Sequence, residues 1–142
     1  MYNDILVPTD GSPGMAPVID HASNLAAIHD ATIHGLYVVD TASLTDVPIE
    51  VTLEGVNDAL REEGEKALAE LAEATGDVPV ETESIDGSPA RQILTYAQEA
   101  DADLIVMGTH GRSGVDRLLL GSVAERVVRS SSVPVLTVRV DT

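Results

Sequence analysis

The chain has 142 residues, of which 24 are acidic, 8 are basic and none is cysteine, and its formal net charge is −16. The lack of cysteine excludes disulfides, thiolate catalysis and zinc–thiolate sites, and the negative charge argues against binding to nucleic acids or anionic membranes, which requires a positive surface. Such an excess of carboxylates is typical of proteins adapted to high salt, where the Debye length falls to about 3 Å and like charges are screened.

The length and the apolar content predict one domain over residues 1–142. A cytoplasmic location is expected because the sequence shows neither a membrane span nor a signal peptide. Hydrophobic residues make up 44% of the chain, with neither Phe nor Trp, and an aliphatic core of this kind is common in α/β folds with buried parallel strands. No run approaches the roughly 18 apolar residues that cross a bilayer. The first residues, "MYNDILVPTD", have neither the basic nor the apolar region of a signal peptide.

Short apolar runs alternate along the chain with segments of helical periodicity. The runs predict strands at residues 4–9, 31–40, 78–84, 102–109 and 133–140. Between them the patterns predict helices that begin near Ser12-Pro13, span residues 52–75, and begin near Ser88-Pro89 and Gly121-Ser122. The order β-α-β-α-β-α-β-α-β, with right-handed crossovers, makes a parallel sheet with helices on both faces.

Local signals refine these elements. Each Ser-Pro pair is typical of a helix N-cap followed by proline at the first helical position. Gly76 fits the end of the long helix. The segment 78–84 alternates apolar and polar residues and contains Pro79, which predicts a half-exposed edge strand. The run 102–109 is continuously apolar and predicts a buried central strand.

The stretch "MGTHGRSGVDRLLLGSVAERVV", residues 107–128, places four glycines around the junction of this strand with the last helix. It contains neither G-x-G-x-x-G nor G-x-x-x-x-G-K-[ST], and Lys66 is the only lysine in the chain. Backbone N–H groups in the loop at Gly111 to Gly114 and at the helix start Gly121-Ser122 could each hold an anion. Two such contacts separated by a spacer suit a polyphosphate; the alternative is that the glycines serve turns and a helix cap.

The spacing Gly108-x2-Gly111-x9-Gly121-Ser122 resembles the G-x2-G-x9-G-[ST] signature of the ATP-binding class of the universal stress protein family. "ILVPTDGS" is similar to that family's first strand and turn, and "ADLIVMGTHGRSG" with "LLLGSVAERVVRSSSVPVLTVR" to its last third. The resemblance covers essentially the whole chain. It implies a single doubly wound α/β domain with a five-stranded parallel sheet of order 3-2-1-4-5, Rossmann-like and similar to the adenine nucleotide alpha-hydrolases.

The resemblance also implies a site for ATP or another adenine nucleotide, to which Mg²⁺ could come with the phosphates. Asp10 and Val38 would face the adenine, Val38 through its backbone. The other implied contacts are Pro8 and Met107 around the nucleoside, Gly108 near the ribose, and Gly111, Gly121, Ser122 and Val123 at the phosphates, largely through backbone N–H groups. Within the spacer, Arg112 and Arg117 are candidate partners of a γ-phosphate.

Each of these assignments has a simpler alternative. Asp10 could be a turn residue, Met107 could be core packing, and "YVVD" allows a slip from Val38 to Val39. The two arginines could instead form surface ion pairs. No pair of nucleophile and base is evident in the sequence, so we expect ATP to order the site or to be hydrolysed slowly rather than turned over efficiently. No histidine shows metal-ligand spacing.

Three other functions stay open. The first is a dimeric interaction protein that binds no nucleotide, because the resemblance implies a homodimer through the last strand, Val133–Val140, and an unprotected apolar edge invites pairing. The second is a phosphoacceptor module using Asp10, Asp86 and Thr109, although the chain lacks the second acid after strand one and the lysine after the last strand that such a module needs. The third is a flavin module, for which only tyrosines are present as stacking aromatics.

Overall fold

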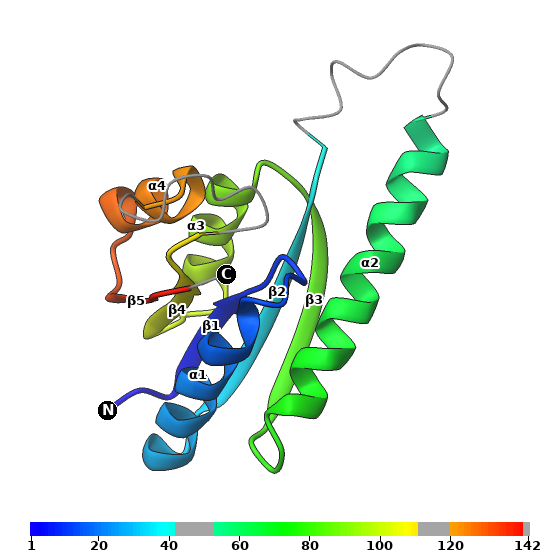
Figure 1. The fold of residues 1–142 in the computed structure, drawn as a ribbon. Coiled ribbons are helices and arrows are strands. Elements are labelled where there is room, and N and C mark those ends of the chain that lie inside the picture. The colour runs from blue at the N-terminus through cyan, green and yellow to red at the C-terminus, as the bar shows by residue number, and fades with distance from the viewer. Residues whose placement is uncertain (42–52, 111–119, 141–142) are drawn as a thin grey trace.

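The computed structural model describes residues 1–41, 53–110 and 120–140, with the backbone alone for residues 53–57. Its five strands form one parallel sheet of order β3-β2-β1-β4-β5, which confirms the predicted topology (Figure 1). The strands are β1 (Asp4–Pro8), β2 (Thr32–Asp40), β3 (Val80–Gly87), β4 (Leu104–Gly108) and β5 (Val135–Val138). The helices are α1 (Met15–His29), α2 (Leu53–Ala74), α3 (Pro89–Glu99) and α4 (Ser122–Ser130).

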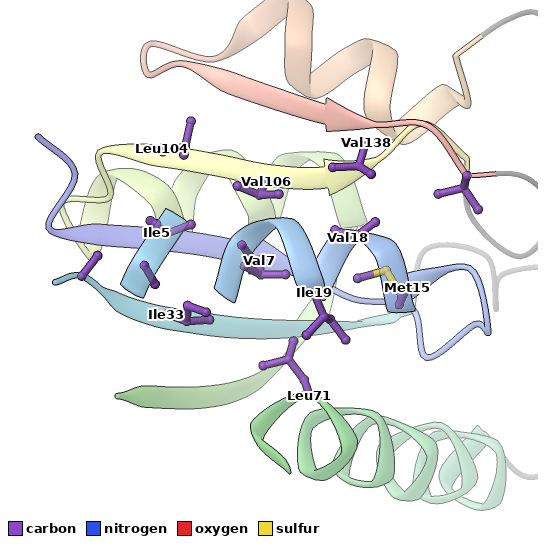
Figure 2. Packing of buried hydrophobic residues seen from close by; sticks show 14 residues of the cluster. Ile5, Val7, Met15, Val18, Ile19, Ile33, Leu71, Leu104, Val106 and Val138 are labelled. Atoms are coloured by element: carbon purple, nitrogen blue, oxygen red, sulfur yellow. The ribbon is translucent and has the colours of Figure 1, made fainter. Parts of the chain in front are cut away.

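Helices cover both faces of the sheet. Figure 2 shows the first face, where Ile5, Val7 and Val106 pack with α1 and with Leu71 of α2. The opposite face packs against α3 and α4, and its buried strand residues are Leu6, Leu36, Ile105 and Met107. Successive residues of β4 are therefore buried on alternate faces, which explains its continuous apolar run. No helix among the described residues is long and apolar enough to cross a membrane.

The edge position of β3 is confirmed, but the predicted bounds 78–84 are wrong at both ends. Gly76 has φ +65° and ends α2 as predicted, and the N–H of Val78 then bonds to the carbonyl of Thr75, so this segment is a turn. At the other end, β3 runs on because β2 is long and pairs Asp40 with Gly87.

The two Ser-Pro pairs differ in the structure. Ser88 is the N-cap of α3 with Pro89 at its start, as predicted. The same prediction at Ser12-Pro13 is wrong, since α1 begins at Met15 with Gly14 as its N-cap. The N–H of Ser12 bonds to the side chain of Asp10, and the carbonyl of Ser12 accepts the N–H of Met15 at 3.1 Å, so a turn precedes the helix at this point.

The last strand is shorter than the predicted range 133–140. Before β5, the hydroxyl of Ser131 bonds to both the carbonyl and the N–H of Val133, which makes a turn there. After β5, the N–H of Val140 bonds to the hydroxyl of Thr109 rather than to a neighbouring strand. Backbone groups at both ends are therefore used outside the sheet.

Candidate functional site

The sheet has its topological switch point between β1 and β4. These strands are neighbours, with Ile5 opposite Leu104 and Leu6 opposite Ile105. From β1 the chain leaves through α1 on one face, and from β4 it leaves through α4 on the other face (Figure 1). In open α/β sheets, ligands bind outside the carboxyl ends of the strands at such a point. The candidate site therefore lies beyond the ends of β1 and β4.

The loop after β1 is held by its own hydrogen bonds. The N–H of Thr9 donates to the carbonyl of Leu36 at 2.9 Å, which ties the loop to β2. The N–H of Gly11 then donates to the Thr9 hydroxyl at 3.1 Å, and the N–H of Ser12 donates to Asp10 Oδ1 at 2.9 Å. Asp10 thus shapes the turn as the simpler interpretation expected, and the turn holds its carboxylate at the carboxyl end of β1.

The end of β4 is closely packed at Gly108. A Cβ atom at this position would lie 2.8 Å from Cγ2 of Val140 and 3.4 Å from the carbonyl oxygen of His110. Val140 is buried, with 6% of its surface exposed, and it also fills the space where a side chain on Gly14 would stand. A side chain at this position would therefore force Val140 to shift, even with no ligand present.

The start of α4 is the candidate anion-binding element of the site. Gly121 is its N-cap, and the first helical hydrogen bond runs from the N–H of Glu125 to the carbonyl of Gly121 at 2.9 Å. The N–H of Gly121 itself donates to the carbonyl of Thr109 at 2.7 Å. The N–H groups of Ser122 and Val123 come next and precede the first helical bond, so they are the donors that such a helix end offers to an anion.

The structure brings three of the predicted contact residues into one apolar cluster. Val38 and Val123 are half-buried at this cluster on the α3 and α4 face, and Met107 lies within it, 5% exposed. Val39 points to the other face, where it packs with α2. Pro8 is buried at the end of β1, two residues beyond the β1–β4 pair Leu6–Ile105.

Three of the predicted residues, Gly111, Arg112 and Arg117, lie outside the described residues. Within the described part of the chain, no group of three or more His, Asp or Glu side chains is placed to hold a metal ion. A hydroxyl–imidazole contact does exist, between Thr109 Oγ1 and His110 Nδ1 at 3.1 Å. That hydroxyl also accepts the N–H of Val140, so it already serves the packing of the C-terminal segment.

Asp86, one residue of the phosphoacceptor alternative, lies apart from Asp10. Asp10 follows β1, whereas Asp86 lies at the end of β3, and β2 separates those two strands. Asp86 instead bonds to the guanidinium of Arg61 on α2 at 2.7 Å, and this hydrogen bond is the main cause that raises the pKa of Arg61. Asp86 therefore ties α2 to the edge of the sheet.

The sequence does not reveal the structural roles of two residues at the site. It marks Thr109 only as a candidate phosphoacceptor, yet Thr109 joins β4, β5 and α4 through backbone bonds. It predicts Val140 in the last strand, yet Val140 packs against Gly14 and Gly108. A hydroxyl residue directly after a strand-ending glycine is a signal that could have marked Thr109, but no local pattern marks Val140.

These features define a class of protein: a doubly wound parallel α/β protein with a helix N-terminus held at the switch point of its sheet. The model of the universal stress protein family matches residues 1–139, and the chain belongs to this family. Among curated relatives, universal stress protein MJ0531 of Methanocaldococcus jannaschii is 43% identical over 142 residues, which cover 98% of this chain and 83% of the relative.

Solved structures agree with this assignment. Universal stress protein UspA from Lactobacillus plantarum has a TM-score of 0.86 and 30% identity, with coverage of 97% of this chain and 98% of that chain. A universal stress protein in complex with cAMP has a TM-score of 0.73 and 28% identity, with coverage of 99% of both chains. The fold is thus shared with proteins of the same family, one of which was solved with an adenine nucleotide.

Proposed function

We propose that this chain binds an adenine nucleotide, ATP, at the carboxyl ends of β1, β2 and β4. The observation that carries the proposal is the start of α4, where the N–H groups of Ser122 and Val123 precede the first helical hydrogen bond beside the end of β4. A helix N-terminus at a switch point binds phosphate through such groups and through the helix dipole. The related protein in complex with cAMP supports the nucleotide class.

The proposed pose follows the order of residues along this edge. Asp10 and Val38, at the ends of β1 and β2, would take the adenine, and the nucleoside would lie against Pro8, Met107 and Gly108. The phosphates would lie at α4, with Gly121, Ser122 and Val123. From outside the described residues, Gly111 would add a backbone contact, and Arg112 and Arg117 would add positive charge.

Mg²⁺ would accompany the triphosphate, because it needs few protein ligands beyond the phosphate oxygens themselves. The nucleotide would act as a signal that orders the site in a stress response, with hydrolysis slow at most. The high negative charge of the chain argues against a nucleic acid or a membrane surface as the ligand, because both require a positive protein surface. A small ligand held by local N–H groups does not have this requirement.

Isothermal titration calorimetry tests the proposal. We expect saturable binding of ATP in molar KCl, and weaker binding of GTP, whose base differs at the edge that Asp10 and Val38 would contact. Folded protein that takes up no adenine nucleotide would leave the dimeric interaction protein as the better interpretation.

We further propose a homodimer through β5. This strand is an edge of the sheet, and it leaves Leu136 37% exposed. Apolar edge strands are usually paired or covered, because their free backbone groups promote aggregation. Light scattering in molar KCl is expected to give twice the mass of one chain, and a monomeric mass would contradict this proposal.

We also propose that the chain is adapted to high salt. The outer face of α2 exposes the carboxylates of Glu62, Glu63, Glu65, Glu70 and Glu73. Their mutual repulsion weakens as the Debye length shortens. The melting temperature should therefore rise between about 0.1 M and about 2 M KCl. A melting temperature that stays constant or falls over this range would oppose the adaptation.

A further inference from the structure

Thr109 lies at the junction of three elements of the candidate site. Its N–H donates to the carbonyl of Val138 in β5 at 2.9 Å, and its carbonyl accepts the N–H of Gly121 at the start of α4 at 2.7 Å. It directly follows Gly108, the last residue of β4. The backbone of this one residue therefore joins β4 and β5 to the start of α4, whose first N–H groups are the proposed phosphate donors.

The side chain of Thr109 adds two further contacts. Its hydroxyl accepts the N–H of Val140 at 3.1 Å and lies 3.1 Å from Nδ1 of His110, with which it can exchange a hydrogen bond in either direction. Val140 is buried, so its N–H needs this partner. The hydroxyl thus holds the segment after β5 on one side and the first residue of the glycine-rich loop on the other.

We propose that Thr109 is a positioning residue, which sets where the first N–H groups of α4 stand relative to the end of β4. The inference rests on the proposed nucleotide site. The bonds of the Thr109 hydroxyl to Val140 and His110 hold this residue in place, and loss of the hydroxyl would let the Thr109 carbonyl rotate. Because that carbonyl accepts the N–H of Gly121, the N-cap of α4, the helix start would then move and, with it, the first N–H groups of the helix. The phosphates would meet these groups, whereas the adenine and ribose would contact residues of β1, β2 and β4 whose positions do not depend on the start of α4.

This separation gives a specific test, which compares ATP with adenosine. Thr109→Val removes the hydroxyl and keeps the shape of the side chain. We expect the variant to bind ATP about tenfold more weakly by calorimetry in molar KCl, and to bind adenosine within about twofold of the unchanged protein. Thr109→Ser keeps the hydroxyl and should restore ATP affinity. Thr82→Val, the same change at an exposed position of β3, should alter neither affinity.

The outcomes separate the two proposals. If the unchanged protein binds no ATP, the proposed function fails and the role of Thr109 fails with it. If the unchanged protein binds ATP and Thr109→Val binds it equally well, or loses ATP and adenosine to the same degree, the positioning role alone is overturned. Should Thr109→Val unfold before titration, Thr109→Ala removes the same hydroxyl and is expected to show the same loss confined to ATP.

Discussion

The two ends of the sheet use their polar groups in different ways. At the amino end, Asp103 Oδ2 accepts the N–H groups of Asn3 at 2.7 Å and Asp4 at 2.9 Å. Asp4 Oδ1 lies 2.8 Å from Nε2 of His34, whose Nδ1 lies 3.4 Å from a carboxylate oxygen of Glu81. Carboxylates, imidazole and backbone groups of this end thus pair with one another within the chain.

The carboxyl end is built from glycines, turns and a helix start. Its N-cap, Gly121, has no side chain to satisfy the first N–H groups of α4, and the donors at Ser122 and Val123 precede the first helical bond. Titratable side chains at the amino end pair within the chain, whereas the start of α4 has N–H groups ahead of its first helical bond. Such donors are the reason for placing the proposed site at the carboxyl end.

The largest expected effect is at the helix start. Gly121 has φ −62° and ψ 159°, a conformation that valine readily adopts, so Gly121→Val should fold. Its side chain would stand beside the proposed phosphate path, and we expect ATP affinity to fall about a hundredfold, which corresponds to about 3 kcal/mol. Calorimetry measures the affinity, and circular dichroism checks the fold. Unchanged affinity in folded protein would show that the phosphates bind elsewhere.

The next effect belongs to the amino end and concerns stability. Backbone hydrogen bonds from Asn3 and Asp4 lower the pKa of Asp103. Because the folded pKa lies below the unfolded value of about 3.9, the carboxylate stabilises the fold above about pH 4 and this contribution disappears as the pH falls through the folded pKa. Asp103→Ala should therefore lower the free energy of unfolding at pH 7 by about 1–2 kcal/mol.

Urea denaturation at several pH values measures this difference, which should shrink below about pH 4. ATP affinity of Asp103→Ala at pH 7 should stay within about twofold of the unchanged protein, because the residue lies at the other end of the sheet. A large loss of ATP affinity in this variant would show that the amino end of the sheet influences the nucleotide site. The two ends of the sheet would then not act independently.

The smallest expected effect is that of a single hydroxyl at the carboxyl end. Ser122 is exposed at the first position of α4, and we expect Ser122→Ala to weaken ATP binding about threefold, since one hydrogen bond to a phosphate is lost while the backbone donors remain. Ser130→Ala, at the last position of the same helix, is the matched control and should leave the affinity unchanged. If Ser130→Ala weakened ATP binding as much as Ser122→Ala, the loss would not depend on which end of α4 carries the hydroxyl. That result would contradict a phosphate contact by Ser122.

Much of the fold could be predicted from local patterns. Periodicity predicted the order of the nine elements, and the resemblance carried by the glycine spacing predicted the sheet order. The same Ser-Pro pattern predicts the N-cap correctly at Ser88 but not at Ser12, whose carbonyl accepts the N–H of Met15 in a turn ahead of α1. A Ser-Pro pair alone does not distinguish a helix start from such a turn.

The candidate site was less predictable where distant segments meet. The sequence relates the glycine at 108 to the approach of a ligand, yet in the structure a side chain there would also displace Val140. The N–H of Gly121 was expected to face a phosphate, yet it bonds to the carbonyl of Thr109. The first fact depends on how the segment after β5 packs beside β4, and the second on how the start of α4 meets the end of β4. No local sequence pattern describes either contact.

A crystal structure of the protein with bound ATP is the most direct test of the central claim. We predict phosphate density at the start of α4, about 3 Å from the backbone nitrogens of Ser122 and Val123, and adenine density beyond the ends of β1 and β2, near Asp10 and Val38. Nucleotide density at the amino end of the sheet, or phosphates remote from α4, would contradict the account.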